Sequence, residues 1–124
     1  MQLPALFDLT GKVAVVTGGG GVLCGAISGG LASAGAKIAI ADCSIEKAQR
    51  KADEIDSRGG IAKAYPVDVL DRASTETCCE TVLSDFGRID VLVNGVGGNR
   101  KEATTSPEQS FFDLPVEAFR EVSF

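Results

Sequence analysis

Short apolar segments alternate along the chain with longer segments in which apolar residues recur every three or four positions. The apolar segments are 13–16, 37–41, 61–65 and 89–93, and β-branched or small residues dominate them. Such runs are typical of strands that are covered on both faces. Because segments with helical spacing separate them, the pattern predicts βαβ units with right-handed crossovers and a parallel sheet.

Residue types that start and stop helices mark the ends of the intervening segments. The first helix follows the glycines at 18–21, carries Leu23, Ile27 and Leu31 at helical spacing, and stops at Gly35. For the later helices, we expect starts at Ser44, Asp71 and Pro115 and stops at Gly59 and Gly87. We therefore predict an α/β fold, a doubly wound parallel sheet of the Rossmann type with strand order 3-2-1-4 and helices on both faces.

Four consecutive glycines separate the first strand from the first helix. Glycine adopts backbone conformations closed to other residues and brings backbone N–H groups close to whatever lies over the turn. Together with the positive end of the helix dipole, these N–H groups form a site for a phosphate. A glycine run can also be a flexible loop, and the motif alone leaves both interpretations open. The candidate binding residues here are Gly18, Gly20, Gly21, Val22 and Leu23.

Small or polar residues also follow the other predicted strands, where ligands of open parallel sheets lie. Asp42, after the second strand, can accept hydrogen bonds from both hydroxyls of an adenosine ribose. Its charge would repel a 2′-phosphate, which favours NAD over NADP. It can equally be a solvated carboxylate that precedes and caps the next helix. The other candidates at the strand ends are Cys43, Asp68, Val69, Asn94, Gly95 and Val96.

The residues after the third and fourth strands also have two interpretations. Asp68 can be a turn residue, and Asn94 can belong to an Asx turn. In the functional interpretation, Asp68 accepts a hydrogen bond from the adenine amino group and the N–H of Val69 meets a ring nitrogen. Asn94 then ties the fourth strand to its neighbours, while Gly95 and Val96 leave room for the second ribose.

Composition narrows the classes of function. The net charge of -5 argues against nucleic acid as a partner, and no apolar run approaches the roughly 20 residues of a membrane span. The start of the chain has no basic n-region of a secretory signal, so we expect a cytoplasmic protein with reduced cysteines. With no histidine and no Cys-x-x-Cys pair, we expect neither a zinc site nor an imidazole base.

In combination, these features resemble the N-terminal half of a short-chain dehydrogenase/reductase. The family's Thr-Gly-x-x-x-Gly-x-Gly motif aligns without gaps to residues 17–24, and its acidic residue aligns to Asp42. Its Asp-Val pair aligns to 68–69, and its Asn-Asn-Ala-Gly motif aligns to 94–97. The resemblance covers essentially all 124 residues.

Three residues depart from these motifs. Val22 and Cys24 stand where the family usually has glycine, and Gly95 replaces the second Asn. Val22 limits how closely the backbone approaches a pyrophosphate, and Gly20 and Gly21 can supply that room instead. The small side chain of Cys24 still allows the helix and the strand to lie close together.

The resemblance implies hydride transfer between the nicotinamide of NAD and a hydroxyl or ketone carbon of a small molecule. The glycine run and the loop leading to 111–114 are similar to a subgroup of the mannonate/fructuronate type, which acts on sugar acids. The family's chemistry uses Ser, Tyr and Lys, with Tyr-x-x-x-Lys on a later helix. The one tyrosine, Tyr65, lies in the third strand without a lysine four residues on, so we assign no catalytic residue to this chain.

We interpret residues 1–124 as a dinucleotide-binding domain that is truncated before the catalytic half. The fourth strand would then be an open sheet edge that leaves Val91 and Val93 uncovered. We expect this edge to be covered by further chain after Phe124 or by association, and the protein to be a homo-oligomer. The function that we predict is that of an NAD-dependent oxidoreductase, and the alternative is a non-catalytic dinucleotide-binding module.

Overall fold

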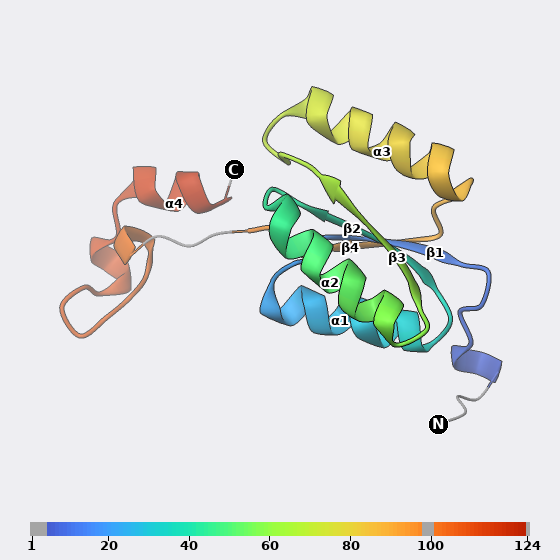
Figure 1. Ribbon diagram of the computed structural model, residues 1–124. Coiled ribbons are helices and arrows are strands. Elements are labelled where there is room, and N and C mark those ends of the chain that lie inside the picture. Colours follow the sequence, from blue (N-terminus) through green and yellow to red (C-terminus); the bar gives the residue numbers. More distant parts are fainter. Residues whose placement is uncertain (1–4, 98–100, 124) are drawn as a thin grey trace.

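The computed structural model describes residues 5–97 and 101–123, and its centre is a parallel sheet in the order β3-β2-β1-β4. The strands are β1 (Val13–Thr17), β2 (Lys37–Asp42), β3 (Ile61–Pro66) and β4 (Val91–Asn94). The helices are α1 (Val22–Ser33), α2 (Ile45–Ser57), α3 (Arg72–Phe86) and α4 (Val116–Ser123). Helices α1 and α2 cover one face of the sheet and α3 covers the other (Figure 1), which confirms the predicted fold.

Each face of the sheet has its own apolar core. The core under α1 and α2 contains Ala14, Val16, Ile38, Ile40, Ala48, Ala52 and Ile55. The core under α3 contains Val15, Ala39, Ala41, Tyr65, Val67, Cys78 and Val82. Alternate residues of the same strand thus enter opposite cores, which explains why the strands are apolar without interruption.

Helix α1 turns a face of small residues toward the sheet. Cys24, Gly25 and Ser28 are the buried residues of this helix, whereas Leu23 is 73% exposed. The helical spacing therefore predicted the helix correctly, but its first two residues, Val22 and Leu23, are exposed at the end of the sheet that carries the glycine turn.

Strand β4 begins two residues later than the apolar pattern predicts. Asp90 precedes it and accepts hydrogen bonds at Oδ2 from the N–H of Val13 (2.9 Å) and from Arg88 Nε (2.8 Å), which lower its pKa. Val91 and Val93 pack against the core under α1 and α2, so the expectation that they are uncovered is wrong. Leu92, on the other face of this edge strand, is 59% exposed instead.

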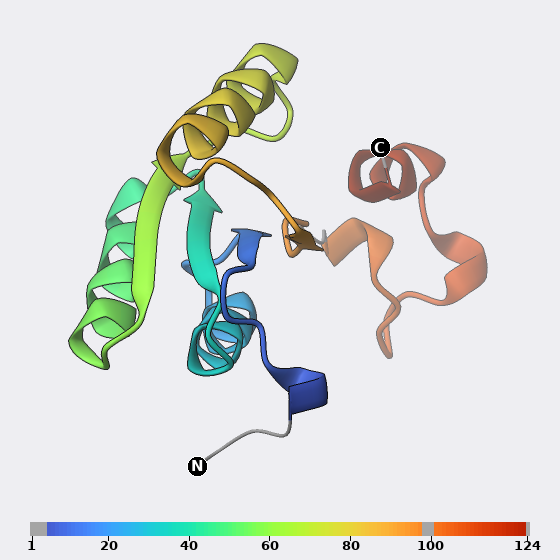
Figure 2. The same ribbon diagram turned by 90° about the vertical axis from the view of Figure 1, so that its right-hand side faces the viewer.

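The segment 101–123 lies apart from the sheet and its three helices (Figures 1 and 2). It contains the short 3-10 helices Lys101–Ala103 and Phe111–Asp113 and ends in α4, directly after Pro115 as predicted. Phe111 and Phe112 are both more than half exposed. Among residues 5–97 and 101–123, no helix combines the length and apolar character that crossing a membrane requires.

A buried tyrosine connects β3 to α3. The hydroxyl of Tyr65, 3% exposed, donates a hydrogen bond to Asp85 Oδ2 at 2.7 Å, and Lys63 Nζ lies 2.7 Å from the same oxygen. Both contacts lower the pKa of Asp85, while burial and the neighbouring carboxylate raise the pKa of Tyr65. Tyr65 is therefore engaged in holding the fold together, on the face of the sheet that α3 covers.

This connection should make stability depend on pH at both extremes. A lowered carboxyl pKa stabilises the fold above about pH 4 and loses its effect as pH falls through the folded value. A raised tyrosine pKa stabilises the fold below about pH 10 and loses its effect as pH rises through the folded value. In urea titrations, the free energy of unfolding should fall less at acid pH in Asp85→Asn than in wild type. At alkaline pH it should fall less in Tyr65→Phe than in wild type. An unchanged pH profile in both variants would contradict this, and Glu80→Gln on the same helix is the control.

Candidate functional site

The glycine turn is held between the ends of three strands. Gly18 has a φ of +68°, and its N–H donates to the carbonyl of Ala41 at 2.7 Å. A Cβ at position 18 would lie 2.5 Å from the carbonyl oxygen of Gly95. Position 18 thus requires glycine for two reasons, its left-handed conformation and its close approach to the loop after β4.

The start of α1 leaves backbone donors available at this turn. Gly21 is the N-cap of the helix and provides no side-chain cap. The N–H groups of Val22 and Leu23 donate to no residue in the described part of the chain. Because the helix dipole places positive charge at the same end, these groups suit an anion.

Thr17 connects β1 to β4 at the same end of the sheet. Its Oγ1 accepts a hydrogen bond from the N–H of Gly95 (3.0 Å) and donates one to the carbonyl of Val93 (3.3 Å). The Asn94 side chain, which we expected to make this tie, bonds to no residue in the described ranges. A hydroxyl at the last position of a strand was the available signal, and sequence reasoning assigned it no role.

Asp42 combines the two interpretations that the sequence left open. Its carboxylate is buried; Oδ1 accepts from the N–H of Ser44 and Oδ2 from the N–H of Gly20, each at 3.0 Å. Ser44 in turn caps α2 by accepting from the N–H of Lys47. Since each carboxylate oxygen has two acceptor sites, one on each remains for a ribose hydroxyl.

A groove lies beside Asp42, between the end of β3 and α3. Its lining residues are Cys43, Pro66, Val67, Asp68, Ala73, Ser74 and Thr77. The N–H of Asp68 donates to Ser74 Oγ (2.9 Å), and its Oδ1 accepts from the N–H of Leu70 (3.0 Å). Asp68 therefore is a turn residue, and its Oδ2 accepts no hydrogen bond from the residues that the structure describes.

A second groove lies between α1 and α2, next to the glycine turn. Its lining residues are Gly20, Gly21, Val22, Gly25, Ala26, Lys47, Arg50, Lys51 and Glu54. Sequence reasoning missed the three cations, because helical spacing places them on a face of α2 that looked merely solvated. The structure places them next to the glycine turn.

The residues predicted to bind a ligand all lie at the carboxyl end of the sheet. Thr17 pairs with Ala41 on one side and with Asn94 on the other, and Asp42 pairs with Pro66. Four of the candidate side chains are apolar and yet substantially exposed, namely Val22, Leu23, Val69 and Val96. Exposed apolar side chains around free backbone donors are typical of a binding surface.

Two departures from the family motifs fit each other in space. A Cβ at Gly95 would overlap Cys24 Sγ and would lie 2.7 Å from the carbonyl oxygen of Thr17. The thiol of Cys24, on α1, therefore occupies the space that a larger residue at position 95 would need. The two positions are compatible because one of the two has no side chain.

The comparisons with known proteins match this geometry. The family described as short chain dehydrogenase matches residues 12–122, and the chain belongs to this family. An oxidoreductase of Bacillus subtilis called UxuB is 44% identical over an alignment 126 residues long that covers 95% of this chain and 45% of the relative.

Solved structures show the same relationship. A proposed D-mannonate oxidoreductase from Haemophilus influenzae with bound NAD superposes with a TM-score of 0.80 at 35% identity, covering 93% of this chain and 45% of that one. A 7α-hydroxysteroid dehydrogenase complexed with NADH superposes with a TM-score of 0.78 at 31% identity, covering 94% and 42%. The chain thus spans less than half the length of these relatives.

Proposed function

We propose that this chain is the dinucleotide-binding part of an NAD-dependent oxidoreductase that acts on a hydroxyl or ketone carbon. The observation that carries the proposal is the hydrogen bond from the N–H of Gly20 to Asp42 Oδ2, because a phosphate bound at the glycine turn would then lie next to a ribose bound at Asp42. The NAD-bound and NADH-bound neighbours of the same fold support NAD as the cofactor.

The described residues fit the parts of NAD in order. The free N–H groups of Val22 and Leu23 face the diphosphate, and the Asp42 carboxylate accepts hydrogen bonds from the adenosine ribose. The groove beside it receives the adenine, where Asp68 Oδ2 is available as an acceptor. NAD supplies the hydride chemistry when bound, and this chain's residues bind and orient it.

The remaining proposals concern the protein beyond this site. Its substrate class would be a sugar acid, supported by the likeness to a proposed D-mannonate oxidoreductase. Residues 1–124 would be one domain of a longer protein, supported by the relatives' greater length. The unpaired edge of β4, with Leu92 exposed, would be covered by further chain or by a second copy in a homo-oligomer. A non-catalytic binding module would have the same site, and turnover of a sugar acid by the full-length protein distinguishes the two.

Cysteine labelling tests the placement of NAD. Cys43 is exposed and lines the adenine groove, whereas Cys79 is exposed on α3 and is not among the groove's lining residues. Saturating NADH should slow alkylation of Cys43 by iodoacetamide at least about tenfold, because a bound ligand buries most of its own surface and its site. Peptide mass spectrometry should show Cys79 labelling at an unchanged rate. Equal labelling of Cys43 with and without NADH would contradict the proposed site.

A further inference from the structure

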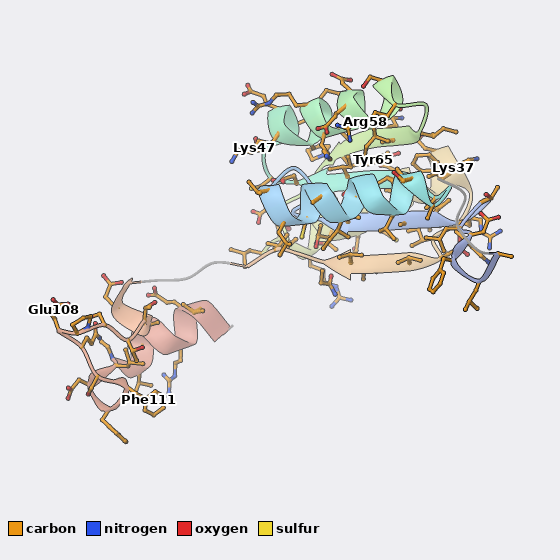
Figure 3. The ribbon with its side chains drawn as sticks, turned by 90° about the horizontal axis from the view of Figure 1, so that it is seen from below. Lys37, Lys47, Arg58, Tyr65, Glu108 and Phe111 are labelled. Atoms are coloured by element: carbon orange, nitrogen blue, oxygen red, sulfur yellow. The ribbon has the colours of Figure 1, made fainter. Side chains whose placement is uncertain are left out.

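The loop after β4 lies on the far side of the glycine turn from Asp42. Because β1 is placed between β2 and β4, a dinucleotide with its adenosine at Asp42 and its diphosphate at the start of α1 continues toward the end of β4. Figure 3 shows the chain leaving β4 at the end of the sheet that Lys47 marks, opposite Lys37. The first residues of this loop, Gly95 and Val96, are both exposed. The second half of the dinucleotide would therefore lie over them.

Three contacts hold Gly95 in place. Its N–H donates to Thr17 Oγ1 at 3.0 Å. A Cβ at Gly18 would lie 2.5 Å from its carbonyl oxygen, so the glycine turn lies directly against this peptide. A Cβ at Gly95 itself would overlap Cys24 Sγ and would lie 3.2 Å from Cys24 Cβ. The thiol thus fills the space beside the Cα of Gly95.

Of these three contacts, only the one with the thiol comes from α1. Cys24 is 8% exposed and belongs to the core under α1 and α2. Its carbonyl oxygen accepts a hydrogen bond from Ser28 Oγ at 2.8 Å. The residue before it, Leu23, provides one of the free N–H groups at the start of the helix. The same turn of α1 therefore carries a donor for the diphosphate and the side chain that spaces the loop after β4.

We propose that Cys24 is a positioning residue for the second ribose of the dinucleotide, the one that carries the nicotinamide. It acts through Gly95, because its thiol sets the distance between the start of α1 and the loop on which this ribose rests. The volume of the side chain has this effect, and its reactivity has no part in it. The proposal rests on the proposed function, since a ligand reaches the loop only if it also lies along α1.

Removing the sulfur should affect one half of the ligand more than the other. It leaves an empty space between α1 and the loop, and Gly95 has no side chain to fill that space. The loop then moves toward α1 or occupies several positions, because protein interiors are close-packed and relax around a lost atom. The adenosine and diphosphate contacts come from β2, the glycine turn and α1, so they remain. The loss should be confined to ligands that contain the second ribose.

The test compares the Kd values of ADP, ADP-ribose and NADH, measured by isothermal titration calorimetry. Cys24→Ala removes the sulfur and keeps a strong helix former in the first turn of α1. We expect the Kd values of ADP-ribose and NADH to rise at least about fivefold, and that of ADP to stay within about twofold of wild type. Cys24→Ser, which nearly restores the volume, should keep all three within about twofold.

Cys24→Val is the second variant, because a larger side chain pushes Gly95 outward and should also separate ADP-ribose from ADP. Cys78→Ala is the matched control. It removes the same sulfur from a site that is also 8% exposed, in the core under α3, and should leave the ratio of the Kd values for ADP-ribose and ADP unchanged.

Four results would overturn this proposal alone. They are a wild-type ratio in Cys24→Ala or Cys24→Val, an equal loss of all three ligands, a full loss in Cys24→Ser, and the same ratio change in Cys78→Ala. Absence of ADP and NADH binding by the wild-type chain would instead overturn the proposed function, and this proposal with it.

Discussion

Gly95→Ala should destabilise the chain by about 1–3 kcal/mol, the usual cost of overfilling a packed site. The new methyl group would overlap Cys24 Sγ on one side and press on the carbonyl of Thr17 on the other. Neither neighbour can easily move, because Cys24 is buried in the first turn of α1 and the Thr17 carbonyl belongs to the end of β1.

The compensating change is Cys24→Gly, which empties the space that the methyl group needs. In a double-mutant cycle, Gly95→Ala should cost much less in the Cys24→Gly background, with a coupling free energy of about 1–2 kcal/mol. Urea denaturation of the four proteins measures it. Gly97→Ala is the matched control, since a Cβ there meets nothing within 4 Å, and it should change stability by less than about 0.5 kcal/mol. Additive costs would show that the two positions do not share the space.

The fold could be predicted from the sequence because its signals are local. The apolar runs, Ser44 and Asp71 as helix caps, and Gly87 as a stop are each recognised within a few positions, and the structure has each of them. The same reasoning predicted that the polar residues after the strands lie close together, because the carboxyl ends of parallel strands meet at one edge of the sheet. This much required no knowledge of which side chains touch.

The contacts that organise the site could not be predicted, because they join residues far apart in the chain. Thr17 and Gly95, or Cys24 and Gly95, meet only after β4 has paired with β1. The carboxylate of Asp42 looked either free for a ribose or used as a cap, and only the structure shows it bonded to Gly20. Lys47 lies beside the glycine turn because Gly20 lets α2 lie against that turn, which no spacing within α2 indicates.

Gly18→Ala should have the largest effect on cofactor binding. An alanine at φ +68° costs about 1–2 kcal/mol in backbone strain. Its Cβ would also lie 2.5 Å from the carbonyl oxygen of Gly95, which adds about 1–3 kcal/mol or pushes the loop after β4 away from the turn. Because the same turn carries the free N–H groups of α1, we expect the Kd for NADH to rise at least about tenfold.

Gly59→Ala separates these two causes. Gly59 has a φ of +87°, so alanine is strained there too, but its Cβ would meet nothing within 4 Å. It should therefore lose only the strain energy of about 1–2 kcal/mol, and NADH binding should be unchanged because Gly59 follows α2 at the opposite end of the sheet. Urea denaturation and NADH titration of both variants give the comparison. If the two glycines cost the same stability and neither variant loses affinity, the close approach of Gly18 to Gly95 does not shape the site, and the diphosphate must be bound elsewhere.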